Sequence, residues 1–104
     1  MPPELISVVV PVYNEVERIE ELHRRLSAVM GGLGHHELIF VDDGSSDGTW
    51  EAMVDLAHGD KRLRLIRLSR NFGHQLALSA GLEAALGDAV VSIDADLQDP
   101  PEVI

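Results

Sequence analysis

The sequence predicts an α/β fold, a parallel sheet with flanking helices in the order βαβαβαβ. Two observations predict it. The apolar residues alternate between continuous β-branched runs, typical of buried parallel strands, and steps of three or four residues, typical of helices. Apolar residues also make up 45% of the 104 residues and charged residues 25%, so the chain can build a core.

The first strand is predicted over residues 5–12, which are almost continuously apolar. Pro11 lacks an N–H and is expected to end regular strand pairing. A helix is expected from Asn14, with Glu17 completing a capping box and a glycine-rich end at 31–34. Its inward face is expected to carry apolar residues at helical spacing: Val16, Ile19, Leu22, Leu26 and Val29.

The second strand is predicted over residues 37–41, and the third over 63–68. Between them, Ser46 or Asp47 is expected to cap a helix that runs to about His58. The inward stripe of this helix is expected to consist of Trp50, Met53, Val54 and Ala57.

The last predicted helix spans residues 74–86, and a fourth buried strand follows at 89–93. Small side chains in the helix are expected to allow close approach to the sheet. Its inward residues are expected to be Leu78, Leu82, Ala85 and Leu86. His74, at the start of the helix, is interpreted as a cap-region residue.

Charge and composition exclude several classes of protein. Eight lysine and arginine residues against eighteen aspartate and glutamate residues give a net charge of −10, which repels nucleic-acid phosphates. We therefore expect no nucleic-acid partner, and a divalent cation beside any phosphorylated ligand. The absence of cysteine excludes disulfides and thiolate chemistry. No apolar run approaches the length of a membrane-spanning helix, and no signal peptide is recognisable, so we expect the chain by itself to be soluble.

Polar side chains follow each of the four predicted strands. In a parallel sheet the carboxyl ends of the strands lie at one edge, and ligands bind beyond that edge. Four polar clusters at one edge predict a site more firmly than any single cluster would. The clusters are Tyr13-Asn14-Glu15, Asp42-Asp43, Ser69-Arg70-Asn71 and Asp94-Ala95-Asp96.

The last of these clusters has the chemistry of a metal site. Asp94 and Asp96 project the same way from extended backbone, and Gln98 shares their parity. Two carboxylates and an amide oxygen are hard ligands, which suit Mg²⁺ or Mn²⁺. The alternative is a turn with solvated acidic side chains, because an Asp-x-Asp triplet by itself is common.

The other clusters leave two interpretations open. A carboxylate directly after a strand can accept hydrogen bonds from a nucleobase or a ribose, and we favour ligand contact for Asp42 but turn chemistry for Asp43. Tyr13 can stack on a base or lie half-buried in the core, whereas Asn14 fits a helix cap better. Arg70 can meet a phosphate or pair with a nearby carboxylate.

Taken together, these segments resemble the family 2 glycosyltransferases of GT-A fold, in particular the polyprenyl-phosphate glycosyltransferase branch that includes the dolichol-phosphate mannose synthases. The resemblance covers essentially the whole chain. It rests on four motifs in order, at residues 7–15, 41–49, 69–73 and 94–101. It implies that residues 1–104 are the nucleotide-sugar-binding part of such a domain, a Rossmann-like sheet that forms the N-terminal half of a GT-A fold truncated at its C-terminus.

The resemblance also implies an activity. The protein would transfer a sugar, with inversion, from a UDP- or GDP-sugar to a polyprenyl (dolichyl or undecaprenyl) phosphate at the cytoplasmic face of the membrane. Asp94 and Asp96 would be catalytic, holding with Gln98 the Mg²⁺ or Mn²⁺ ion that stabilises the departing diphosphate. The nucleotide would be contacted by Pro11, Tyr13, Glu15, Asp42, Arg70, Asp94, Ala95 and Asp96.

Other functions remain as alternatives. Enzymes of the resembled kind are considerably longer, so we expect the 104-residue chain by itself to bind nucleotide weakly and to turn over little. A non-catalytic nucleotide-binding module is therefore one alternative. A haloacid-dehalogenase-like phosphatase is another, although its Asp-x-Asp motif lies near the N-terminus, whereas this one follows the fourth strand. A receiver-like domain is disfavoured because Lys61, in a loop, is the only lysine of the chain.

Overall fold

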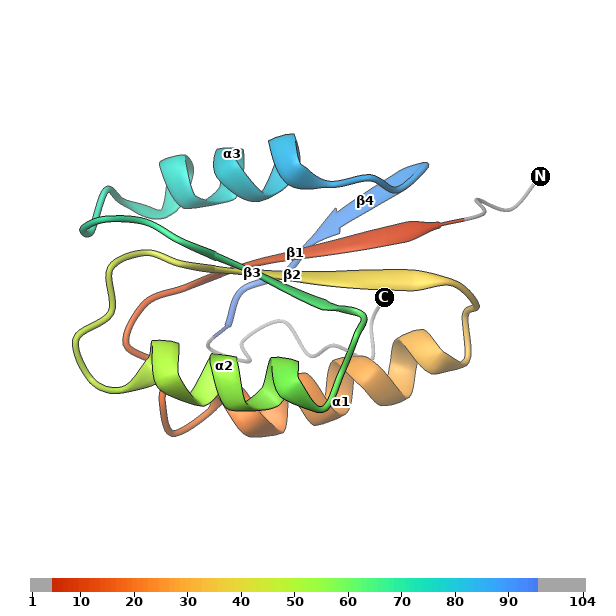
Figure 1. The fold of residues 1–104 in the computed structure, drawn as a ribbon. Helices are drawn as coiled ribbons and strands as arrows, with labels where there is room; N and C mark the ends of the chain where they lie inside the picture. The colour runs from red at the N-terminus through yellow and green to blue at the C-terminus, as the bar shows by residue number, and fades with distance from the viewer. Residues whose placement is uncertain (1–4, 96–104) are drawn as a thin grey trace.

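The computed structural model describes residues 5–95, which form an α/β fold with the predicted order of elements (Figure 1). The strands are β1 (Ile6–Val12), β2 (His36–Asp42), β3 (Leu63–Arg67) and β4 (Ala89–Ser92). The helices are α1 (Ile19–Gly31), α2 (Thr49–His58) and α3 (His74–Ala84). Within the described residues, no helix is both long enough and apolar enough to cross a membrane.

The strands form one sheet in the order β3-β2-β1-β4, and every neighbouring pair is parallel. The two central strands, β1 and β2, are buried along almost their whole length. The sequence predicted a fourth strand that is also buried, but β4 alternates between half-buried and exposed residues. The reason is its place at the edge of the sheet formed by the described residues, where Val90 is exposed.

Helices cover both faces of the sheet: α1 and α2 lie on one face and α3 lies on the other (Figure 1). Alternate residues of β1 divide between two cores because side chains along a strand point to opposite faces. Val8, Val10 and Val12 pack with α1 and α2 in the larger core, whereas Val9 packs with Ala77 of α3 in the smaller one. Because all four strands are parallel, their carboxyl ends lie at one edge of this three-layered fold.

The inward face of α3 differs from the prediction. Leu82 and Leu86 are exposed, and the buried residues are Ala77 and Gly81. A Cβ added to Gly81 would lie 2.3 Å from Cγ1 of Val9, so the helix approaches the sheet through its smallest side chains. The expectation of close approach is confirmed, and Leu78 and Ala85 pack against the smaller core as predicted. Leu82 was assigned to the wrong face, and Leu86 lies beyond the end of α3.

Candidate functional site

A pocket of about 470 Å³ opens at the carboxyl ends of the strands, at the edge where the sequence places its polar clusters. The end of β1 and the residues that follow β1, β2, β3 and β4 all contribute to its wall. They are Pro11, Val12, Tyr13, Glu15, Asp43, Asn71, Gly73, His74, Asp94 and Ala95. The pocket therefore brings together five of the predicted nucleotide contacts, namely Pro11, Tyr13, Glu15, Asp94 and Ala95.

Pro11 lies in the wall of the pocket, and the pairing of β1 with β2 continues past it. It remains in register with Val41, so pairing with β2 continues past Pro11, contrary to the prediction, whereas pairing with β4 ends at Val9 and Ser92, before Pro11, as predicted. The carbonyl of Val9 accepts a hydrogen bond from Ile93, on the β4 side of β1. Alternate residues of a strand present their backbone groups to the same neighbour. Pro11 therefore faces the β4 side, where it has no N–H to extend the ladder beyond Ser92.

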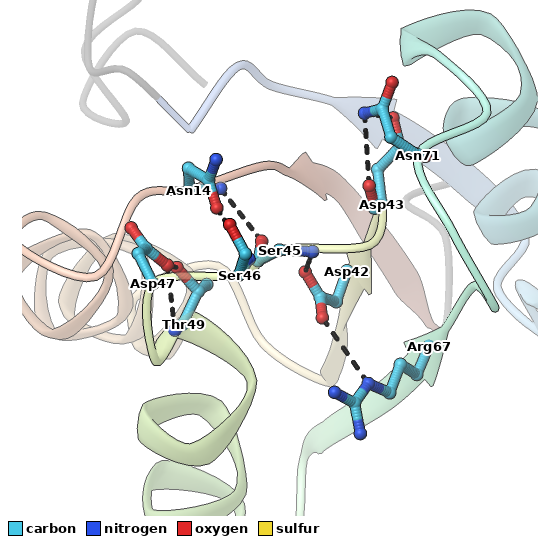
Figure 2. A network of polar contacts seen from close by, with 9 residues as sticks. All are labelled: Asn14, Asp42, Asp43, Ser45, Ser46, Asp47, Thr49, Arg67 and Asn71. Atoms are coloured by element: carbon cyan, nitrogen blue, oxygen red, sulfur yellow. Dashed lines mark hydrogen bonds and ion pairs between the residues drawn. The ribbon is translucent and has the colours of Figure 1, made fainter.

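Asn14 joins the loop after β1 to the loop after β2 (Figure 2). Its amide N–H donates to Oγ of Ser45 at 2.8 Å, and its side-chain Oδ1 accepts from the Ser46 amide at 2.8 Å. The sequence assigned Asn14 to a helix cap, but α1 begins only at Ile19 and its N-cap makes no side-chain hydrogen bond. Asn14 has φ +52°, a left-handed conformation that asparagine tolerates, and it fixes the strand ends relative to each other.

Asp47 fixes the start of α2 in the same network. Its carboxylate accepts hydrogen bonds from the amide and the hydroxyl of Thr49 and from the amide of Val16. Burial acts to raise the pKa of Asp47, but these hydrogen bonds outweigh it and hold the pKa below its ordinary value. The Thr49 hydroxyl in turn accepts the Glu15 amide N–H at 3.0 Å, which holds Glu15 at the pocket.

Asp42 and Asp43, at the end of β2, have different partners and different positions relative to the pocket. Asp42 is fully buried; its Oδ1 accepts the Ser45 amide at 3.1 Å, while Oδ2 has no hydrogen-bond partner and lies 3.9 Å from Nε of Arg67. Asp42 does not line the pocket, whereas Asp43 does. The sequence favoured turn chemistry for Asp43, and in the structure its carboxylate holds the loop after β3 through Asn71, Phe72 and Gly73.

The acidic end of β4 faces the start of α3 across the pocket. The side chain of Asp94 is half-exposed, and its Oδ1 lies 3.8 Å from Nε2 of His74. Sequence reasoning missed His74 as a wall residue because a histidine at a helix start is usually a cap-region residue. Asp96 and Gln98, the other two predicted metal ligands, lie outside the described residues. Within residues 5–95, no three histidine, aspartate or glutamate side chains converge as a metal-binding group.

Arg70 does not line the pocket, although the sequence places it near the base or the phosphates. It is exposed, and its guanidinium lies 4.2 Å from the centre of the Phe72 ring. The wall of the pocket instead carries the carboxyl-bearing residues Glu15, Asp43 and Asp94. Such a wall repels a diphosphate unless a cation accompanies it.

Comparison with known proteins gives a consistent result. The sequence model for glycosyl transferase family 2 matches residues 7–104. YkcC of Bacillus subtilis, an uncharacterised glycosyltransferase, is 52% identical over 94% of the chain, and the undecaprenyl-phosphate 4-deoxy-4-formamido-L-arabinose transferase of Salmonella paratyphi A is 45% identical over 99%. The chain spans about a third of the length of these relatives, 31% and 32% respectively.

Two solved structures share the fold. The mannosyltransferase PcManGT of Pyrobaculum calidifontis, solved with GDP-Man and Mn²⁺, superposes with a TM-score of 0.83 at 29% identity, over 96% of this chain and 34% of that one. TarS 1–349 of S. aureus, solved with UDP, gives a TM-score of 0.74 at 29% identity, over 88% of this chain and 27% of that one. The predicted parallel sheet of a GT-A fold is thus confirmed.

Proposed function

The chain belongs to glycosyl transferase family 2, and on this premise we propose that its pocket takes the nucleotide of a UDP- or GDP-sugar, whose sugar the whole protein transfers to a polyprenyl phosphate. The observation that carries the proposal is the convergence of Tyr13, Glu15 and Asp94 on one pocket at the carboxyl ends of the strands. A relative that acts on undecaprenyl phosphate and a neighbour solved with GDP-Man support the acceptor and the donor.

In this proposal the nucleoside lies against the loop after β1. Tyr13 is exposed at the pocket and offers a ring face to a base, while Pro11 and Glu15 form the wall beside it. Asp42 remains a proposed contact through its Oδ2, which has no hydrogen-bond partner; because that atom is buried and outside the pocket wall, a nucleotide would reach it only after the loops above it move apart. Arg70 would reach the donor from the rim, since it does not line the wall.

A Mg²⁺ or Mn²⁺ ion fits the donor set of this edge. Asp94 presents a half-exposed carboxylate at a pocket that Glu15 and Asp43 also line, and hard oxygen ligands of this kind suit both ions. Asp96 and Gln98 are the proposed further ligands, and Ala95 would contact the nucleotide through its backbone. When bound, the ion would neutralise charge that develops on the leaving diphosphate.

The acceptor needs little activation, because a polyprenyl phosphate is already an anion and attacks the sugar carbon without a strong general base. Direct attack on that carbon inverts its configuration. We place the reaction at the cytoplasmic face of the membrane, where a lipid-linked acceptor and a soluble nucleotide sugar meet.

Calorimetric titration of the 104-residue chain with UDP, GDP, UDP-glucose and GDP-mannose, with and without Mn²⁺, tests the pocket. We expect binding to one base series that strengthens with Mn²⁺, and an affinity about tenfold lower in Asp94→Ala because a carboxylate ligand is lost. Asp55→Ala, which removes an exposed carboxylate from α2, is the matched control. Metal-independent binding that is equal in both variants would contradict the proposal.

A further inference from the structure

Of the described residues that line the pocket, His74 alone has a basic side chain. The wall also carries three carboxylates, those of Glu15, Asp43 and Asp94. Arg70, in the loop before α3, stays outside the wall and lies against a phenylalanine ring. An anionic ligand in this pocket therefore meets one basic group of the described chain, which is the His74 imidazole.

The ring of His74 is open at the pocket, and its side chain is 57% exposed. Nε2 lies 3.8 Å from Oδ1 of Asp94, which is longer than a hydrogen bond, and within residues 5–95 no other group bonds to the ring. The backbone, in contrast, is fixed, because α3 begins at His74 and the Ala77 amide N–H donates to the Gly73 carbonyl. A ligand can therefore recruit the imidazole without breaking a hydrogen bond of the described chain.

Asp94 would place a cation, and any phosphate bound to it, beside His74. Oxygen ligands lie about 2.1 Å from Mg²⁺, and charge-assisted N–H···O contacts are about 2.8 Å long. A phosphate oxygen on a cation held by Asp94 is therefore within reach of an imidazole that stands 3.8 Å from the same carboxylate. Nothing in this arrangement depends on which base the nucleotide carries.

We propose that His74 is a diphosphate-binding residue, whose ring N–H donates to a phosphate oxygen of the nucleotide from the α3 side of the pocket. The proposal rests on the proposed function in taking the ligand to be a nucleoside diphosphate with its cation. Neutral imidazole carries one N–H and imidazolium carries two, so a donor is present in either protonation state. The contact strengthens the binding of UDP and GDP alike and leaves that of the nucleosides uridine and guanosine unchanged.

His74→Phe is the informative substitution, because it keeps a planar ring and removes both ring nitrogens. His58→Phe is the matched control, since His58 is an exposed histidine at the end of α2 that does not line the pocket. The Kd values of UDP and GDP are measured by calorimetry in Mn²⁺, and those of the nucleosides by NMR titration. We expect His74→Phe to bind both diphosphates about tenfold more weakly, from the loss of one hydrogen bond to a charged group, and His58→Phe to bind them as the wild type does.

His74→Gln tests whether the N–H donor carries the effect. Its side-chain amide keeps an N–H but forms a neutral hydrogen-bonding group, so we expect UDP and GDP affinities within about threefold of those of the wild type. Mn²⁺ titrated without nucleotide should bind wild type and His74→Phe equally, because His74 is proposed to contact the phosphates and not the ion.

A further measurement needs no nucleoside. Pyrophosphate added with Mg²⁺ should move the NMR signals of the His74 ring and leave those of His58 in place. Because this probe carries only the proposed partner of the imidazole, it decides the role of His74 separately from the identity of the nucleotide.

Equal affinities of wild type and His74→Phe for UDP and GDP would overturn the inference, as would an equally large loss for the nucleosides. A loss of Mn²⁺ affinity in His74→Phe would overturn it too, because His74 would then be a metal ligand. A wild-type chain that bound neither UDP nor GDP would instead contradict the proposed function. In that event the pyrophosphate titration still decides, and unmoved His74 signals would make the inference wrong.

Discussion

Glu37 and Asp42 lie at opposite ends of β2, and both side chains are buried. Glu37 accepts hydrogen bonds from the Ser7 hydroxyl, from Nη1 of Arg64 and from the Leu86 amide. Asp42 accepts one, from Ser45, and leaves an oxygen without a partner. At the amino end of the strand, the Glu37 carboxylate stabilises the fold through its hydrogen bonds. At the carboxyl end, one oxygen of Asp42 has no hydrogen-bond donor within the described residues.

This difference agrees with where ligands bind in parallel α/β sheets. At the amino end, the Ser7 hydroxyl also accepts the Gly87 amide N–H, so one network ties β1, β2, β3 and the connection after α3. At the carboxyl end, hydrogen bonds run between loops and surround a pocket. Stability and binding capacity are therefore separated along a single strand, and substitutions at the two ends should have different consequences.

The largest effect on stability is expected from Glu37→Ala. It would leave the Ser7 hydroxyl and the Leu86 amide without their acceptor, and Arg64 with the Ala84 carbonyl alone, at a cost of about 3 kcal/mol in the free energy of unfolding. Urea unfolding followed by circular dichroism measures it. Glu83→Ala, an exposed position on α3, is the control and should change stability little. Equal stability of the two variants would show that the amino-end network does not hold the fold.

An intermediate effect is expected from Glu37→Gln, and it should depend on pH. Burial acts to raise the pKa of Glu37, but hydrogen bonds from Ser7, Leu86 and Arg64 and the charge of Arg64 outweigh it, so the pKa lies below its ordinary 4.5. As pH falls, the unfolded chain therefore binds a proton before the folded chain does. The stabilisation is full above pH 4.5 and is lost as pH falls through the lowered folded-state value.

We accordingly expect the wild-type chain to be about 1 kcal/mol more stable than Glu37→Gln near neutral pH, and the difference to shrink on acidification below pH 4.5. Urea unfolding of both chains between pH 3 and pH 7 measures this difference, in which other titrating groups cancel. A difference that stayed constant across the range would show that the charge of Glu37 contributes nothing.

The sequence predicted the order of the elements because each depends on a local apolar period. It could not place the start of α1, since Asn14 is used by Ser45 and Ser46 of another loop instead of by its own helix. It misassigned Leu82 of α3 because a helix pressed against a sheet packs through its smallest side chains. These failures share one cause, which is that the partner is distant along the chain.

Part of the candidate site could also be predicted from the sequence. The edge of the sheet follows from strand polarity, and the five wall residues follow from the family resemblance of the motifs. The different positions of Asp42 and Asp43 relative to the pocket do not, because neighbouring residues point to opposite sides and their partners, Arg67 and Asn71, come from later in the chain.

The smallest effect is expected from Asp42→Asn, and it sharpens the contrast with Glu37 most directly. Asparagine can keep the oxygen that accepts the Ser45 amide while its NH₂ group replaces the oxygen without a partner. The change removes a buried charge whose nearest cation, Nε of Arg67, stands 3.9 Å away, so little stabilisation is lost with it. We expect the free energy of unfolding to change by less than about 1 kcal/mol, measured by urea unfolding beside Glu37→Gln at pH 7. A loss as large as that of Glu37→Ala would mean that the fold itself depends on Asp42, and the proposed separation of the two ends of β2 would be wrong.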